Sequence, residues 1–137
     1  MALQYSEAVR NARLDQIETT IGTNVGLLIY TGLPPATPEA APTGTLLVAM
    51  SLPADWMAAA SSGTKAKQGT WSATAVGTGT AGYFRITNGS PTDVGQIQGQ
   101  VGTTGESPTP DMGLDNQSIS SGQTVTVSTF TITSGNA

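Results

Sequence analysis

The chain has 137 residues, a net charge of −4 and only 10% charged side chains. It contains no cysteine and no histidine, which excludes disulfides, thiolate metal sites and histidine-based catalysis. Its few basic residues form no stripe that could follow a nucleic acid backbone, and no apolar run is long enough to cross a membrane. We therefore expect one domain that binds neither nucleic acid nor membrane.

The composition favours β structure. Glycine occurs 17 times and threonine is abundant, and these residues suit tight turns and strands respectively. Apolar residues make up 37% of the chain and many of them are alanine, so the core must be small. A small core combined with few surface charges leaves a free monomer prone to association. We therefore expect part of the surface to contact another protein.

The one clear helix is predicted from Ser6 to Gly22, in the segment SEAVRNARLDQIETTIG. Ser6 can cap its first turn, and Gly22 can adopt the left-handed conformation that ends a helix. A narrow apolar stripe runs along it, formed by Leu14, Ile17 and Ile21. Because the helix is only modestly amphipathic, this stripe can pack either on its own domain or on a neighbouring subunit. In the second case Leu3 and Tyr5, which precede the cap, would be the anchors.

After Gly22 the pattern changes to short strands. Strands are expected at residues 25–31, 45–52, 69–76, 83–87, 94–101 and 124–133, with shorter extended pieces in MGLDN and QSI. Residues 32–44 contain four prolines, including Pro34 and Pro35, and are predicted to form a long surface loop. Residues 53–63, PADWMAAASSG, are expected to form one or two turns of helix.

Two of the predicted strands have irregular patterns. Residues 94–101, VGQIQGQV, are rich in glycine and are expected to be curved or bulged. In residues 124–133 the apolar face switches near Ser128, which indicates a bulge or a crossing between two sheets. Short strands with frequent turn signals predict a mainly β domain, an antiparallel β-sandwich or jelly-roll-like fold over residues 23–137. An N-terminal arm and α-helix at residues 1–22 precede it.

The segment GTGTAG, from Gly77 to Gly82, matches the G-x-G-x-x-G fingerprint of dinucleotide-binding loops. A loop of that class opens a helix whose N-terminus holds the pyrophosphate. Here YFRIT follows, which favours a strand, and neither Asp93 nor Glu106 is placed to bind a ribose. The segment is therefore expected to be a glycine-rich hairpin connection whose glycines let strands approach closely.

A second motif suggests catalysis. Ser62-Gly63-Thr64-Lys65 matches the S-x-x-K motif of acyl-enzymes, in which serine opens a helix and lysine lies one turn later. Gly63 disfavours that helix, so the motif is not expected to be catalytic. Lys65 and Lys67 are instead expected to be solvated or to pair with acidic residues of a neighbour.

Acidic residues raise two further candidates, a calcium site and a catalytic pair of carboxylates. Asp111, Asp115 and Asn116 supply too few oxygens for a calcium ion and are expected to cap turns. Glu39 and Glu106 lie in proline-bearing loops, where the cleft and raised pKa of a glycosidase pair are not expected. We therefore expect no enzymatic activity, no metal and no cofactor.

Several stretches taken together resemble a family of small structural proteins encoded by tailed bacteriophages and prophages. They are YSEAVRNARLDQIETTIG, TLLVAMSLPADWMAAASSGTKAKQGTW, GTAGYFRI, IQGQV and MGLDNQSISSGQTVTVSTFTITSGNA. The resemblance covers nearly the whole chain and rests on residue order. It implies a virion protein made in the host cytoplasm, and within that class we favour a capsid decoration (cement) protein on the outside of the head. A tail or neck protein is the alternative.

A decoration protein would bind the major capsid protein and bridge neighbouring capsomers, commonly as a trimer. We therefore expect a homo-oligomer that stabilises the capsid through its N-terminal segment and its proline loop. The residues expected at the oligomer or capsid interface are Leu3, Tyr5, Leu14, Ile17, Ile21, Pro34, Pro35 and Trp56.

The two tryptophans bear on the remaining alternative. Trp71 is expected in the core, whereas Trp56 suits a core position and an interface equally well. A carbohydrate-binding adhesin module would need exposed aromatic side chains on a concave face, for which Trp56 and Tyr83 are the candidates.

Overall fold

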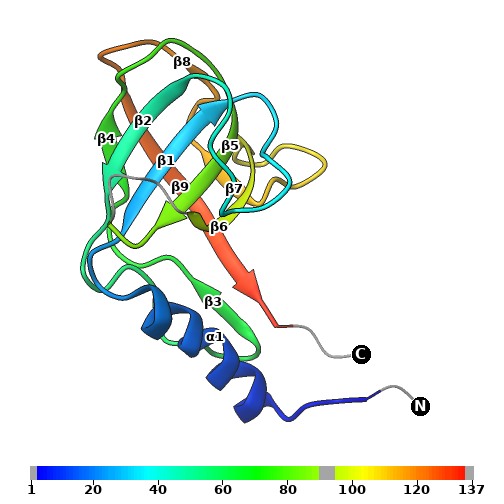
Figure 1. Ribbon diagram of the computed structural model, residues 1–137. Helices are drawn as coiled ribbons and strands as arrows, with labels where there is room; N and C mark the ends of the chain where they lie inside the picture. Colours follow the sequence, from blue (N-terminus) through cyan, green and yellow to red (C-terminus); the bar gives the residue numbers. More distant parts are fainter. Residues whose placement is uncertain (1–2, 90–94, 135–137) are drawn as a thin grey trace.

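The structure is a computed structural model that describes residues 3–89 and 95–134 (Figure 1). Helix α1 (Glu7–Ile21) lies beyond one end of a curled sheet of short strands. The strands are β1 (Gly26–Thr31), β2 (Leu46–Ser51), β3 (Thr64–Ala66), β4 (Ser72–Thr74), β5 (Gly79–Thr87), β6 (Gly95–Thr103), β7 (Met112–Leu114), β8 (Ser118–Ile119) and β9 (Thr124–Thr133). The described chain is thus mainly β with one N-terminal helix, as the sequence predicts.

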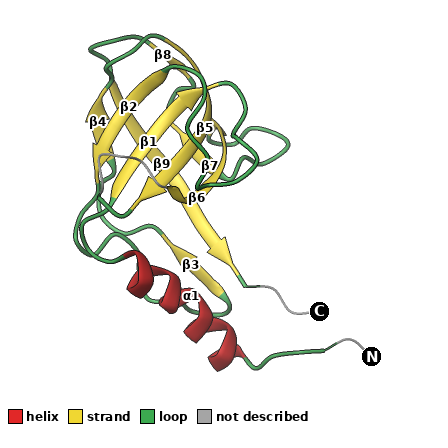
Figure 2. Ribbon diagram, in the orientation of Figure 1, coloured by secondary structure: helices red, strands yellow, loops and turns green. Residues whose placement is uncertain are grey.

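The described strands join in one mixed sheet that curls into a half-barrel (Figure 2). Their hydrogen-bonded order is β2-β1-β5-β6-β7-β9-β3, with β4 attached to β9 and β8 attached to β5. Among these pairs, β6 and β7 alone are parallel, so the expectation of a wholly antiparallel sheet is corrected. The pairing is parallel because residues 104–111 lead the chain back along β6. As a result, β7 starts beside Val101 and runs in the same direction as β6.

The two sides of the curled sheet approach each other between β4 and β2 and stay apart between β6 and β9. The N–H groups of Val76 and Gly77, just after β4, both donate to the carbonyl oxygen of Leu47 on β2, at 2.8 and 3.2 Å. Opposite this contact, β6 and β9 are bridged by β7, which has only three residues. The half-barrel is therefore nearly closed between β4 and β2 and open beside β7.

A row of aromatic rings runs through the core. The ring centroids of Trp56 and Trp71 are 6.2 Å apart, those of Trp71 and Phe130 5.7 Å, and those of Phe130 and Phe84 5.5 Å. Both tryptophans are fully buried, which confirms the prediction for Trp71. Trp56 is a core residue as well, and its indole N–H donates to the carbonyl oxygen of Gly22 at 3.0 Å. Of the two positions considered for Trp56, the single chain therefore shows the core position.

Helix α1 has the predicted ends. The Ser6 hydroxyl accepts a hydrogen bond from the Val9 N–H at 3.3 Å, and Gly22 follows the last turn with φ 94°. Leu14 and Ile21 are buried within the single chain, Ile21 belongs to the core, and Ile17 is partly buried against that core. Of the two alternatives for the stripe, the structure therefore shows packing on the chain itself.

Residues 53–63 do not form the predicted helical turns. Backbone hydrogen bonds run instead from Ala58 N to Ala66 O and from Gln68 N to Trp56 O, at 2.8 and 2.9 Å. A two-residue turn at Ser62-Gly63, with φ 52° and 72°, reverses the chain into β3, a strand that the sequence does not predict. Burial of Trp56 in the core overrides the local preference of the alanines for helix.

Both irregular strands are bulged, as predicted. On β9, Thr129 and Val127 pair with successive residues of β7, which leaves Ser128 without a cross-strand partner in that ladder. On β6, Ile97 and Gly95 pair with successive residues of β5. Val94, which belongs to the predicted strand, and Asp93 lie outside the described residues.

The segment GTGTAG is not a hairpin connection, because β4 before it pairs with β9 whereas β5 pairs with β1 and β6. Its glycines allow close backbone approach, as predicted. A Cβ atom on Gly77 would collide with the carbonyl oxygen of Leu46, and one on Gly82 would collide with the backbone of Gly32. A side chain at Gly77 would push β2 away from the segment after β4, and one at Gly82 would push the proline loop away from β5.

Candidate functional site

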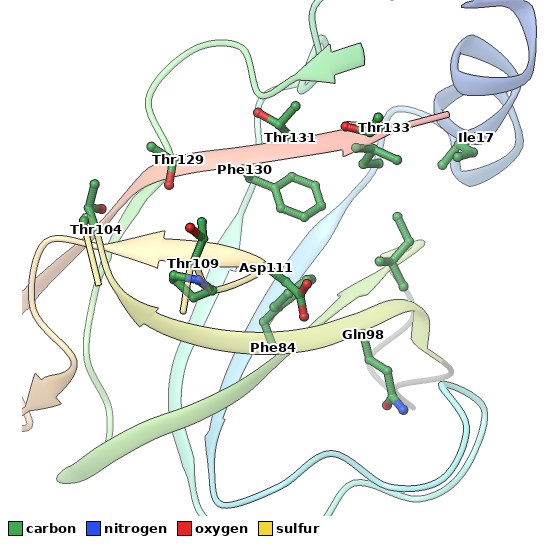
Figure 3. A pocket seen from close by; sticks show the side chains of 14 residues that line it. Ile17, Phe84, Gln98, Thr104, Thr109, Asp111, Thr129, Phe130, Thr131 and Thr133 are labelled. Atoms are coloured by element: carbon green, nitrogen blue, oxygen red, sulfur yellow. The ribbon is translucent and has the colours of Figure 1, made fainter. Parts of the chain in front are cut away.

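A cleft of about 690 Å³ opens between β6 and β9 (Figure 3). Phe84 and Phe130 form its floor, and residues 104–111 border one end. Ile17 of α1 borders the other end. Two smaller hollows, of about 330 and 430 Å³, continue the cleft along α1 and share Ile17 with it.

The cleft exists because β7 is shorter than its neighbours. Adjacent strands lie about 4.8 Å apart, so β6 and β9 are two strand spacings apart where β7 fills the gap. β7 pairs with β6 over Val101–Thr103 and with β9 up to Phe130. Within the described chain, no strand fills the gap before Met112, although β6 and β9 both continue there.

Backbone groups of both strands face this gap. The Gln100 N–H donates to the Oδ2 atom of Asp111 at 2.9 Å, so the main chain of Gln100 is directed toward the cleft. Peptide groups of a strand alternate between its two edges, so the main chain of Gln98 faces the same way. On β9, Phe130 and Ser134 bond to residues on the β3 side, which directs the peptide groups of Thr131 and Thr133 toward the cleft.

The lining combines an apolar base with a polar rim. Ile17, Ile97 and Ile132 are partly buried and pack against the core. Hydroxyls of three threonines of β9 lie along the rim, at Thr129, Thr131 and Thr133. An apolar centre surrounded by polar groups is the arrangement found at protein–protein interfaces.

Lys65 fixes α1 in place next to the cleft. Its side chain is only 1% exposed, and its ammonium nitrogen lies 2.7 Å from Asp15 Oδ1 and 2.7 Å from Glu18 Oε2. It also donates a hydrogen bond to the carbonyl oxygen of Ala58 at 2.9 Å. Lys65 is therefore neither solvated nor bound to a neighbour, and this corrects the expectation. The S-x-x-K motif has no free amine to act as a base.

The two charges perturb each other's pKa. The hydrogen bond from Lys65, followed by the one from the Ala60 N–H, holds the pKa of Asp15 below its ordinary value. Burial by itself would lower the pKa of Lys65, but its hydrogen bonds to Asp15 and Glu18 outweigh burial and raise that pKa. The pair is therefore ionised over the whole neutral range.

Further side chains of α1 accept hydrogen bonds from the loop before β3. The N–H of Ala60 donates to Asp15 at 3.0 Å, and the N–H of Gly63 donates to Asn11 at 2.9 Å. Polar contacts thus add to the burial of Leu14 and Ile21 in attaching helix α1 to the half-barrel. These contacts place Ile17 at the end of the cleft.

The N-terminal arm, residues 3–6, extends from α1 away from the half-barrel (Figure 1). Leu3 is 72% exposed and Tyr5 is 41% exposed. The Arg13 guanidinium lies 5.1 Å from the centroid of the Tyr5 ring. Of the residues expected at an interface, these two are the most accessible to another chain.

The proline loop, residues 32–44, is bound to the outer face of β5 and β6. The Gln98 amide donates to Pro35 O at 2.7 Å, and the Tyr83 hydroxyl both donates to Thr43 O and accepts from Thr43 N, at 2.7 and 2.9 Å. Pro34 and Pro35 are half-buried in this position. The loop therefore covers its own sheet, and within it Leu33 is the large apolar side chain that is mostly exposed.

Leu14, Ile21 and Trp56 are buried inside the chain, so their surfaces are not presented to a partner in this conformation. Trp56 and Tyr83 are both 0% exposed, so the aromatic platform expected of a carbohydrate-binding module is not formed by them.

The remaining polar candidates cap turns, as predicted. Asp115 Oδ1 accepts hydrogen bonds from the N–H groups of Asn116 and Thr126, and Asn116 Oδ1 accepts one from Ser118 N–H. Asp111 caps Gln100 at the cleft. In residues 3–89 and 95–134, no cluster of three acidic, histidine or cysteine side chains could hold a metal ion.

No helix of the described ranges is both long enough and apolar enough to cross a membrane. Comparisons with protein-family models, curated proteins and solved structures find no match.

Proposed function

We propose that the chain is a non-enzymatic structural protein of a tailed-phage virion, and specifically a capsid decoration protein on the outside of the head. The resemblance in residue order supports the virion class. The observation that carries the proposal is the cleft between β6 and β9, which is apolar at its base and bordered by backbone groups of two strands. Such a site suits an extended protein segment.

Strand edges and clefts of this kind take part in assembly. An extended segment can add to a sheet edge, where main-chain hydrogen bonds give affinity and side-chain pockets give specificity. Among the residues that line the cleft, Asp111 is the one with an acidic or basic side chain, and its carboxylate already accepts a hydrogen bond from the Gln100 N–H. The cleft is therefore better suited to binding a chain than to acid–base chemistry.

The finer description of the fold belongs to this proposal. We infer that the two sides of the curl act as the layers of a sandwich-like body, with β2, β1, β5 and β6 facing β4, β7 and β9. The edge-to-face contact between Phe84 on β5 and Phe130 on β9 supports this reading, because it joins the two sides across the core. Sandwich-like and jelly-roll-like domains recur in viral shells.

The partners in this proposal are the major capsid protein and further copies of the chain, with a trimer as the favoured oligomer. Several modest contacts on a symmetric lattice combine into tight binding, since each contact raises the effective concentration of the next. A protein of this kind stabilises a shell without any strong single site.

Co-sedimentation tests the proposal. Purified protein is mixed with empty heads and, separately, with isolated tails of the phage that encodes it. We expect saturable, stoichiometric binding to heads and none to tails. Binding to tails alone would assign the protein to the tail or neck, and binding to neither would overturn the proposal. A glycan array with a positive signal in the absence of particle binding would favour the adhesin alternative.

A further inference from the structure

We propose that the cleft between β6 and β9 binds the N-terminal arm of a second copy of the chain, residues 3–5, as an added strand. This inference rests on the proposed structural role and names the partner that occupies the cleft. Three features of the chain support it: the strand edges at the cleft, the side-chain pattern of the arm, and the reach of the arm.

The strand edges match a short extended segment. The peptide groups of Gln98 and Gln100 face the gap from β6, and those of Thr131 and Thr133 face it from β9. Asp111 already caps the Gln100 N–H, so an added strand would pair with β6 before this residue and with β9 at Thr131 and Thr133. A segment of three residues, such as Leu3 to Tyr5, is long enough to lie beside Thr131–Thr133 and to continue the line of β7.

The side chains of the arm also match the cleft. In an extended segment, Leu3 and Tyr5 point to one side and Gln4 points to the other. The base of the cleft is apolar and includes Ile97 and Ile132, which are only partly buried. Insertion would place Leu3, which is 72% exposed in the single chain, between these two side chains. Removing it from water favours the insertion.

The arm fits the cleft of a second copy better than its own. The cleft ends at Ile17, ten residues along α1 from its first residue, which is a distance of about 15 Å. Residues 3–6 span at most about 14 Å when fully extended. The arm also leads away from the half-barrel (Figure 1). Passing arms from copy to copy around a ring would close a cyclic oligomer, which suits a trimer.

Cysteine cross-linking between differently tagged copies tests the inference. The chain has no cysteine, so each introduced thiol reports on its own position. Leu3→Cys protein is mixed with Ile97→Cys protein of different mass and treated with a short bismaleimide. We expect a covalent heterodimer, at least fivefold more abundant than in a mixture of Leu3→Cys with Leu33→Cys. Leu33 is the matched control because it is 75% exposed and lies on the proline loop.

A second pair of variants, Leu3→Cys with Ile132→Cys, controls for a folding defect caused by the change at Ile97. Ile132→Cys places the thiol on the opposite wall of the cleft, and thermal unfolding checks that each variant is folded. The inference would be overturned if Leu3→Cys cross-linked to both folded cleft variants no more than it does to Leu33→Cys. It would also be overturned if the wild-type protein stayed monomeric at high concentration. Linkage of the cleft cysteine to a capsid subunit during head binding would also overturn it and assign the cleft to the capsid protein.

The two proposals fail separately. Wild-type protein that binds heads while the mixed variants show no specific cross-link would refute arm insertion and leave the decoration role standing. A specific cross-link in a protein that binds neither heads nor tails would support arm insertion and refute the decoration role.

Discussion

Lys65 shows how one residue positions a helix. Its ammonium group is buried between α1 and the loop before β3, where two carboxylates and a carbonyl oxygen accept its hydrogen bonds. A buried ammonium without such partners would be strongly destabilising. Here the partners come from α1 itself, so the burial of Lys65 depends on the attachment of the helix. The position of Ile17 at the cleft depends on the same contacts.

Replacing Lys65 by Met should destabilise the protein by about 2 kcal/mol, because the hydrogen bonds to charged partners are lost and the carboxylates remain. Chemical denaturation measured by circular dichroism would give the free energy of unfolding. Lys67→Met is the control: Lys67 contacts the Trp71 ring and the Gly69 carbonyl at the surface, so the expected loss is below about 1 kcal/mol. Equal losses for both variants would contradict the structural role of Lys65.

The lowered pKa of Asp15 makes the stability of the protein depend on pH in the acidic range. Its pKa is lowered in the folded state, so its contribution is present above the ordinary carboxyl pKa of about 3.9 and is lost as pH falls through the folded value. Lys65, whose pKa is raised, loses its contribution only above about pH 10.4. Between these limits the pair contributes a constant amount.

Urea unfolding between pH 6 and pH 3 should therefore show a smaller fall in stability for Asp15→Asn than for the wild type. Glu39→Gln, a change in an exposed carboxylate of the proline loop, should retain the wild-type fall. If Asp15→Asn and wild type lost stability in parallel, Asp15 would not be a source of the acid sensitivity.

Strand β5 lies between the core on its inner face and the proline loop on its outer face. Its inward side chains, Phe84 and Ile86, pack in the core, while Tyr83 and Arg85 are covered by the proline loop on the outer face. A strand buried on both faces needs neighbours that approach closely. Gly82 provides this approach, because its Cα faces the backbone of Gly32.

Gly82→Ala should accordingly cost about 3 kcal/mol, since the added methyl group overlaps backbone that cannot rotate away. Gly105→Ala is the matched change: Gly105 has φ 88° and open space around its Cα, so the expected cost is about 1 kcal/mol from backbone conformation alone. Thermal unfolding of both variants would measure the difference. A smaller loss at Gly82 than at Gly105 would mean that the proline loop moves away easily.

The whole molecule presents an incomplete half-barrel next to an exposed arm. The gap beside β7 leaves strand edges that a soluble monomer would normally cover or charge. Oligomerisation through the arm supplies the missing strand in our proposal. The cost of ordering the arm is small because it has few residues, so several weak insertions around a ring can act together.

Leu3→Asp should weaken self-association at least tenfold, because it places a charge in the apolar base of the partner's cleft. The thermal stability of the dilute monomer should stay unchanged, since Leu3 is exposed in the single chain. Sedimentation velocity over a concentration series would measure the association. Leu33→Asp serves as the control and should associate like the wild type, and unchanged association of Leu3→Asp would remove the arm from the interface.

Local signals in the sequence determined several features of this fold. The cap at Ser6 and the left-handed Gly22 placed both ends of α1, and the change of apolar face near Ser128 placed the bulge in β9. Glycines at positions 77 and 82 indicated close backbone approach. Each of these features depends on residues a few positions apart, where capping geometry and side-chain alternation act directly.

The tertiary structure decided the features that depend on distant partners. Lys65 is buried by an ion pair with Asp15, 50 residues away, and Trp56 bonds to Gly22, 34 residues away, in place of the predicted local helix. The cleft depends on the length of β7 relative to β6 and β9, which only their pairing reveals. Burial and pairing are set by the free energy of the whole fold, so no short stretch of the sequence contains them.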